Sequence, residues 1–209
     1  MYLPPHFRTE DRAEQFALIR ARPFGLLVTN GPSGLMANPA PFLLDEDAGV
    51  LRAHLARPNP QWREADGSRE ALVVFQDVDA YVTPGWYATK RETGRVVPTW
   101  NYSAVHVYGA LRAIDDRAWL RKLVGDLTDA HEASLRAPWK VEDAPSDYID
   151  VMLRGIVGIE VQIARIEGKA KLSQNRSAAD RAGVVDGLRA TGGEAALRMA
   201  AQVEGATKS

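Results

Sequence analysis

Apolar and polar residues alternate over short stretches in the first third of the chain, and turn-forming residues separate these stretches. The stretch FGLLVTN at 24–30 runs into NGPSG, the stretch at 35–45 ends in DEDAG, and VLRAHLA follows at 50–56. This punctuation predicts antiparallel β-strands joined by hairpins. Pro39 and Pro41 would remove hydrogen-bond donors from the second strand, so we expect that strand at an edge of the sheet or broken by a bulge.

Further strands are predicted at 71–84, 99–114 and 155–168. In the last of these, apolar residues alternate with Glu160 and Gln162, which is typical of a single strand with one buried face. All these stretches follow one another in hairpin order.

Helices are predicted before, between and after the strands. Thr9 can cap a helix that reaches Arg22 and stops at Pro23, a short helix is expected at 58–64, and a longer one at 116–135. Six or so strands with helices around them favour a small β-barrel with flanking helices over a parallel α/β sheet. The expected fold class is therefore mainly β (α+β).

Composition sets the broad class. The 209 residues are 45% hydrophobic and 25% charged, as in ordinary globular chains of one or two domains. Cysteine is absent, which excludes disulfides, thiolate metal sites and thiol nucleophiles and favours the cytoplasm. We expect neither a signal peptide nor a membrane span, since no apolar run of about 18 residues occurs.

The net charge of −1 lacks the basic excess that supplies non-specific affinity for nucleic acids. Residues 125–150 hold seven acids and two bases, a local balance of −5, while residues 168–209 hold seven bases and four acids, a local +3. Solvated helix faces of opposite sign are the simplest interpretation. A polar contact between subunits, or a tail facing DNA, is the alternative.

Several common catalytic motifs are missing. The sequence contains no G-x-G-x-x-G after a strand, no G-x-x-x-x-G-K-[ST], no H-E-x-x-H and no G-x-S-x-G. The histidines have no spacing typical of metal ligands; they are His6, His54, His106 and His131. We therefore expect no metal site.

The stretch HLARPNPQW at 54–62 is unusually polar for the end of a strand. Strand alternation places His54 away from the apolar layer formed by its neighbours. A histidine of this kind is more often a hydrogen-bonded structural residue than a ligand contact. Arg57 and Asn59 follow it, however, and a guanidinium and an amide at a strand end suit a phosphate monoester.

A second cluster is aromatic. It comprises Trp86 and Tyr87 in AYVTPGWYATK, and Trp100 and Tyr102 in VPTWNY. Filling of the core is the simpler interpretation, and a stacking wall for a planar ligand is the alternative. Lys90 and Arg91 suit an exposed turn. A third cluster, KLSQNR at 171–176, is polar and basic, and its role stays open.

These motifs together resemble the PaiB family of bacterial FMN-binding negative transcriptional regulators. The resemblance rests on MYLPPHF, HLARPNPQW, VVFQDVDAYVTPGWY, VPTWNYSAVHVYG, KLSQNR and DRAGVVDGL, in that order, and extends from Met1 to about Leu188. One departure is QDVDA, where the family often has a Gly-Pro turn.

The resemblance implies an FMN-binding split β-barrel that forms a homodimer with flavin sites between subunits. It implies a split-barrel FMN-binding domain at 1–168 and a helical segment at 169–209 packed on it. His54, Arg57 and Asn59 would hold the 5′-phosphate of FMN. Residues that would approach the ring, from the same or the other subunit, are Lys90, Trp100 and Asn101.

The regulatory role has no evident mechanism in the sequence. A helix-turn-helix could place its turn at Gly183, but TGG at 191–193 would break the second helix. Binding to duplex DNA is therefore expected to be weak and to vanish at physiological salt. Whether the chain is an enzyme stays open, and the alternatives are a flavin-dependent oxidoreductase acting on a small molecule, a haem-handling split barrel and a flavin sensor.

Overall fold

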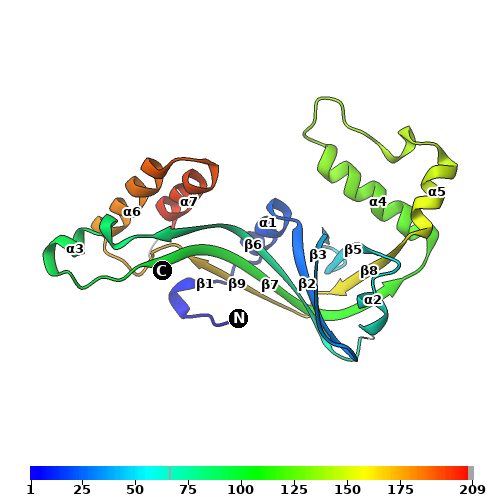
Figure 1. The fold of residues 1–209 in the computed structure, drawn as a ribbon, viewed down its shortest axis with the longest axis horizontal. Coiled ribbons are helices and arrows are strands. Elements are labelled where there is room, and N and C mark those ends of the chain that lie inside the picture. The colour runs from blue at the N-terminus through cyan, green and yellow to red at the C-terminus, as the bar shows by residue number, and fades with distance from the viewer. Residues whose placement is uncertain (66, 207–209) are drawn as a thin grey trace. The chain divides into compact units, whose positions relative to one another are not determined.

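The computed structural model describes residues 1–65 and 67–206, and Figure 1 shows its elements in chain order. The strands are β1 (Arg8–Thr9), β2 (Phe24–Gly31), β3 (Gly34–Pro41), β4 (Leu43–Asp45), β5 (Val50–Ala56), β6 (Glu70–Val82), β7 (Thr99–Ile114), β8 (Ile156–Gln162) and β9 (Arg165–Lys171). The helices are α1 (Arg12–Ala21), α2 (Gln61–Glu64), α3 (Ala88–Thr93), α4 (Arg117–Glu132), α5 (Ser146–Arg154), α6 (Ala178–Thr191) and α7 (Glu194–Gly205), with short 3-10 turns at Pro5–Phe7, Pro84–Trp86 and Val141–Asp143.

The chain forms two compact units. The terminal unit consists of Met1–Leu18, Gln76–Val105 and Glu167–Ser209, and the central unit of Ile19–Phe75 and His106–Ile166. Strands β6 and β7 contribute residues to both. The division expected at residue 168 stays a prediction, and the end of its second part, 207–209, lies outside the described residues.

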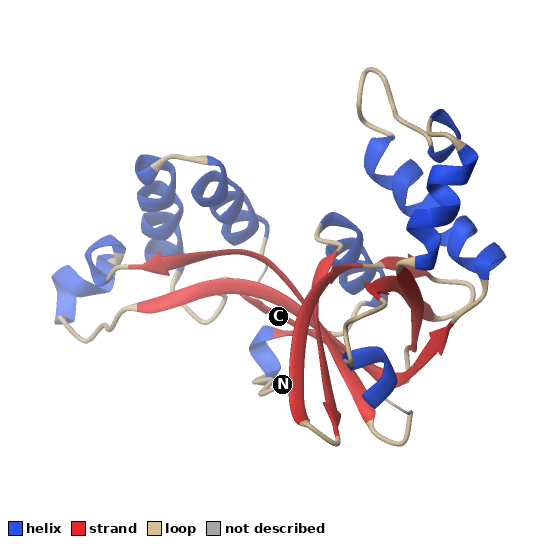
Figure 2. Cartoon of the chain, turned by 45° about the vertical axis from the view of Figure 1, so that its right-hand side comes forward, coloured by secondary structure: helices blue, strands red, loops and turns tan. Residues whose placement is uncertain are grey.

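In the sheet, the strands run antiparallel in the order β3-β2-β6-β7-β8-β5-β4, and β9 pairs with both β1 and β7. Strand β3 stands at the edge, as its prolines predict. The family's Gly-Pro turn has no counterpart here, because residues 76–80 continue β6 without a break. Figure 2 shows the same elements coloured by type, with helices in blue and strands in red.

Two predicted strands are each divided in the structure, and the short strand β1 was not predicted, so the described residues form nine strands where six or so were expected. The stretch at 35–45 forms β3 and β4. The stretch at 155–168 forms β8 and β9, because the backbone N–H of Ile163 donates to Gly49 and that of Ala164 donates to Tyr108, which turns the chain. The single strand predicted there is wrong.

The first helix begins later than predicted. Thr9 lies in β1, opposite Gly168, and the cap is made by Asp11, whose Oδ1 accepts from Ala13 N at 2.8 Å. The predicted cap at Thr9 is therefore wrong, because its backbone is committed to the sheet. The long helix α4 is confirmed, with Asp116 Oδ1 accepting from Trp119 N at 2.7 Å.

The core of the central unit lies on one face of the sheet. Leu51, Ala53 and Leu55 of β5 are buried, while the alternate residues Arg52 and His54 are half-buried. This confirms the predicted direction of His54. A smaller cluster joins α4 to α5 through Leu120, Val141, Ile149 and Leu153.

The core of the terminal unit is covered by α6 and α7, which lie side by side (Figure 1). Its buried residues are Val82, Tyr87, Leu172, Val184, Val185, Leu188, Met199, Ala200 and Val203. Gly183 lies inside the continuous helix α6, and not at a turn. The chain turns instead at Gly192 and Gly193, whose φ angles are 71° and 82°. Within the described ranges, no helix is long and apolar enough to cross a membrane.

Candidate functional site

Arg57 directly follows strand β5, and its guanidinium donates to acceptors of the protein. Its Nη1 and Nη2 donate to the two carboxylate oxygens of Asp115 at 2.9 and 2.7 Å. Its Nε donates to Arg154 O at 2.8 Å, and Nη2 also donates to Ile156 O at 2.9 Å. The hydrogen bonds from Arg57 hold the pKa of Asp115 below its usual value. Four of the five N–H donors of a guanidinium are thus used within the central unit.

The rest of HLARPNPQW also fixes local structure. Asn59 Oδ1 accepts from the backbone N–H of Gln61 at 2.9 Å, and Trp62 Nε1 donates to Arg57 O at 3.1 Å. Gln61 is fully buried, and its amide binds the β2–β3 hairpin. These contacts position α2 against the hairpin, a role that the polar pattern alone did not reveal.

His54 has a ring nitrogen with spare hydrogen-bonding capacity. Its Nδ1 is buried and has no hydrogen-bond partner among residues 1–65 and 67–206. Burial lowers the pKa of His54, so the imidazole is neutral near pH 7, and one of its nitrogens is an acceptor. A buried polar atom without a partner costs stability, and so it marks a place where a ligand or water can bind.

The imidazole of His54 borders a hollow of about 300 Å³ between β5 and α4. The wall is mainly apolar and aromatic, with a second imidazole and two polar residues at its margin. The lining residues are Pro41, His54, Val124, Leu127, Thr128, His131, Glu132 and Trp139. Such a cavity, with few polar groups placed among apolar ones, is typical of a site for a small molecule.

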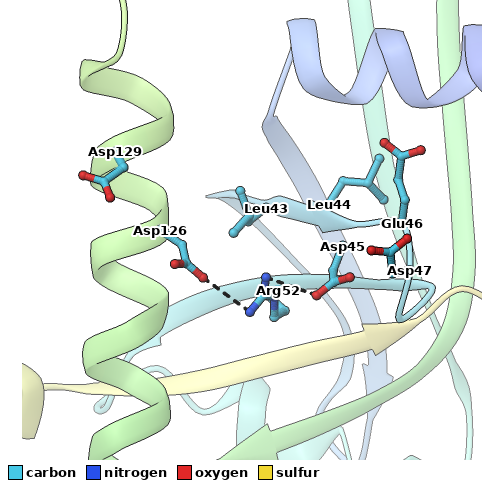
Figure 3. A pocket seen from close by; sticks show the side chains of 8 residues that line it. All are labelled: Leu43, Leu44, Asp45, Glu46, Asp47, Arg52, Asp126 and Asp129. Atoms are coloured by element: carbon cyan, nitrogen blue, oxygen red, sulfur yellow. Dashed lines mark ion pairs between the residues drawn. The ribbon is translucent and has the colours of Figure 1, made fainter.

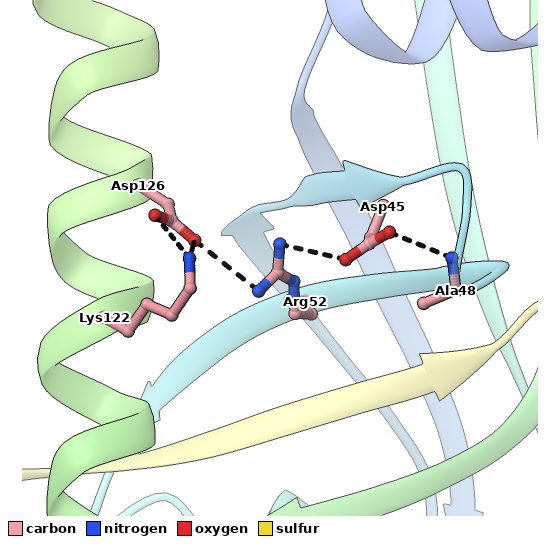
Figure 4. A network of polar contacts seen from close by, with 5 residues as sticks. All are labelled: Asp45, Ala48, Arg52, Lys122 and Asp126. Atoms are coloured by element: carbon pink, nitrogen blue, oxygen red, sulfur yellow. Dashed lines mark hydrogen bonds and ion pairs between the residues drawn. The ribbon is translucent and has the colours of Figure 1, made fainter.

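A larger hollow of about 670 Å³ in the same unit has the opposite character (Figure 3). Its lining is Leu43, Leu44, Asp45, Glu46, Asp47, Arg52, Asp126 and Asp129, five carboxylates to one guanidinium. Arg52 bridges Asp45 at 3.2 Å and Asp126 at 3.5 Å, and Lys122 adds a contact to Asp126 at 2.7 Å (Figure 4). This charge balance opposes binding of a phosphate.

The residues predicted to approach a ring lie in the terminal unit. Lys90 belongs to α3 and is exposed. Trp100 is 53% exposed, and its ring makes an edge contact with Tyr81, centroid to centroid 5.9 Å. Asn101 is fully buried, with its Nδ2 donating to Ser173 Oγ at 3.0 Å. Asn101 therefore holds the KLSQNR segment in place.

Some residues of the aromatic cluster fill the core, and another is free to stack on a planar ligand. Tyr87 is 1% exposed and belongs to the core, and Trp86 packs on α6 at Gly183 and Gly187. The exposed ring of Trp100 leaves a stacking role open. Of the six predicted site residues, the structure places His54, Arg57 and Asn59 together in the central unit; the other three belong to the terminal unit.

Comparison with known proteins gives the family. Residues 1–165 match the family described as "Putative FMN-binding domain". The chain is 30% identical over 206 residues to Protease synthase and sporulation protein PAI 2 of Bacillus subtilis, with 98% of this chain and 97% of that protein covered. It is 36% identical over 216 residues to the uncharacterized protein AN0679 of Emericella nidulans, with 85% and 86% covered.

Solved structures share the fold at low identity. The flavocytochrome Anf3 from Azotobacter vinelandii gives a TM-score of 0.59 at 12% identity, covering 81% of this chain and 72% of that one. The FAD and heme binding protein from Mycobacterium smegmatis gives 0.57 at 16%, covering 78% and 73%. These likenesses confirm the predicted fold class, a split β-barrel with flanking helices. The chain therefore belongs to the family of FMN-binding domains and, by its near full-length similarity to PAI 2, to the PaiB family that its motifs resemble.

Proposed function

We propose that this chain binds FMN non-covalently and acts in the cytoplasm as a PaiB-like negative transcriptional regulator. The observation that carries the flavin proposal is the hollow lined by His54, which lies in the family region, together with the buried Nδ1 of the same imidazole, which has no partner among the described residues. FMN would supply a planar ring with hydrogen-bonding edges and a reversible redox couple.

The hollow fits the ring end of FMN. Its volume of about 300 Å³ is at the lower limit of ordinary ligand pockets. Val124 and Leu127 offer apolar contacts, and Trp139 offers an aromatic face. His54 can complete its hydrogen bonding with a ring N–H or carbonyl group, because either tautomer presents one donor and one acceptor.

The phosphate end has fewer partners in this unit. Arg57 retains one N–H, and the carboxylate of Asp115 beside it would repel a phosphate. The side-chain amide N–H groups of Asn59 are the other donors that HLARPNPQW offers to a phosphate. We therefore propose His54 as a ring contact, Asn59 as a phosphate contact, and Arg57 chiefly as the residue that positions this strand end.

His54→Leu is expected to weaken FMN binding about ten-fold, since it removes one hydrogen bond from a buried site. Fluorescence titration of the apoprotein measures this loss, and His6→Leu is the matched control because His6 is exposed. The absorption spectrum of the purified protein tests the cofactor itself. A Soret band in place of flavin bands, or an apoprotein that does not bind FMN, would contradict the proposal.

We also propose a homodimer, supported by exposed aromatic rings that a second copy would cover. Trp100 and Tyr81 are 53% and 48% exposed and touch each other. Trp100→Ala is expected to weaken self-association and FMN binding together, because a ligand shared by two chains favours their assembly. Sedimentation with and without FMN measures both. A monomer that keeps tight FMN binding would refute the shared site.

Similarity to PAI 2 supports the regulatory part of the proposal, since that relative is named as a protease synthase and sporulation protein. The continuous helix α6 offers no turn at Gly183 for a helix-turn-helix. Direct DNA binding, if used, is therefore proposed to be weak and salt-sensitive. Oxidoreductase activity is the second function that a bound flavin would permit.

A further inference from the structure

The KLSQNR segment at 171–176 is held in a defined conformation by burial and hydrogen bonds. Ser173 adopts a φ of 63°, unusual for a residue other than glycine, and is buried against Asn101. Gln174 accepts from Leu172 N at 2.7 Å and donates to Ala170 O at 2.6 Å. These contacts close the end of β9 and fix the direction in which its side chains leave the strand.

Two lysines at this end have only uncharged partners. Lys171 Nζ donates to Thr99 Oγ1 and, at 2.9 Å, to Trp100 O. Lys169 Nζ donates to Tyr2 O at 3.1 Å and lies 5.3 Å from the centroid of the Tyr102 ring. No carboxylate pairs with either ammonium group within residues 1–65 and 67–206.

The lysines lie on the same face of β9, because they are two residues apart. Lys169 is 9% exposed and Lys171 is half-buried. Burial, and then the charges of Lys169 and Arg176, lower the pKa of Lys171. Concentrated positive charge is thus held partly out of water, an arrangement that costs stability unless an anion compensates it.

Nearby carboxylates are already engaged. Glu167 pairs with the ammonium group of Met1 at 2.5 Å. Asp180 is 3% exposed and accepts from Thr89 N at 2.9 Å and Thr89 Oγ1 at 2.8 Å. Both carboxylates are therefore engaged by other groups of the protein.

We propose that Lys169 and Lys171 form a binding site for the phosphate group of a small ligand. An ammonium group has three donors, so Lys171 keeps one and Lys169 keeps two after their protein contacts. A phosphate monoester offers enough oxygens to accept all three and carries the charge that the pair lacks. The inference holds whether or not the chain binds FMN.

The first test measures binding of inorganic phosphate to the full chain by calorimetry, in sodium chloride of equal ionic strength. Lys171→Gln is expected to weaken phosphate binding ten-fold or more, because a charge-assisted bond is lost. Lys169→Gln should weaken it less, since Lys169 is the more deeply buried of the two. Lys122→Gln is the control, because Lys122 is exposed and paired with Asp126. Equal affinity of the wild type and Lys171→Gln, or no binding above the chloride baseline, would overturn the proposal.

A second measurement covers the case in which Lys171→Gln does not fold. The protein is produced with ¹³C-labelled lysine, and the NMR signals of the lysine Cε atoms are followed against pH. Added phosphate is expected to raise the pKa of one signal that Lys171→Arg removes. Absence of any phosphate-dependent lysine signal would contradict the site.

FMN and riboflavin then distinguish the source of the phosphate. If the site takes the phosphate of FMN, inorganic phosphate competes with FMN, and Lys171→Gln weakens FMN but not riboflavin. Phosphate binding by a chain that ignores FMN would support this site and refute the flavin proposal. If the chain does not bind phosphate and Lys171→Gln leaves FMN binding unchanged, the phosphate site is refuted and the flavin proposal is supported.

Discussion

Gly183→Ala is expected to lower the free energy of unfolding by about 3 kcal/mol, at the upper end of what overpacking of a core costs. A Cβ at this position of α6 would lie 2.0 Å from the carbonyl oxygen of Trp86. This contact is with backbone, so no side-chain rotation can relieve it. One turn further, a Cβ on Gly187 would lie 2.3 Å from atoms of the Trp86 ring. The two glycines therefore allow Trp86 to lie directly on the helix.

The matched control is Gly125→Ala in helix α4, where no atom lies within 4 Å of the added Cβ. Alanine favours a helix over glycine by up to about 1 kcal/mol, so this variant should be slightly more stable than the wild type. Urea unfolding measures both. The same substitution then has opposite signs in two helices, and a destabilisation of similar size at both positions would refute the close contact with Trp86.

Gly183 also shows what a local pattern leaves undecided. From the sequence it suited the turn of a helix-turn-helix, because a turn and a close helix contact both demand glycine. The partner that distinguishes them, Trp86, is almost 100 residues away in the chain. The alternation that predicted β2 and β5 was reliable, because each of these strands buries every second residue along most of its length. The break between β8 and β9 depends on Gly49 and Tyr108, far away in sequence, so periodicity could not reveal it.

In the candidate site, too, contacts between residues distant in sequence could not be predicted from local patterns. The polar residues of HLARPNPQW suggested a phosphate site, since a guanidinium and an amide suit an anion equally well whether it is a ligand or a carboxylate of the protein. Asp115, 58 residues from Arg57, takes the guanidinium. His54 could be placed correctly, because its direction depends only on alternation within β5. The lysine pair of β9 could not be predicted as a site from the sequence, because only the structure shows that the two lysines have no carboxylate partner in the part of the chain that it describes.

Gln61→Leu is expected to lower the free energy of unfolding by about 3 to 5 kcal/mol, since several buried polar groups lose their partner at once. Gln61 is fully buried. Its Nε2 donates to Leu27 O, Thr29 Oγ1 and Met36 O at 3.1, 3.2 and 3.2 Å, and its Oε1 accepts from Asn38 Nδ2 at 3.0 Å. Leucine has a similar size but satisfies none of these groups.

The control for this change is Gln76→Leu, because Gln76 is exposed and bonds only locally, to Asp79 at 3.1 Å; its cost should be within about 0.5 kcal/mol, as for most surface substitutions. Urea unfolding followed by circular dichroism compares the two. Gln61→Glu sharpens the test, since it keeps the acceptor for Asn38 but turns an oxygen toward the carbonyls of Leu27 and Met36, and it should be at least as unstable as Gln61→Leu near neutral pH. Near-native stability of both variants would mean that the amide of Gln61 does not hold α2 against the β2–β3 hairpin, and the polar character of this strand end would again need a ligand to explain it.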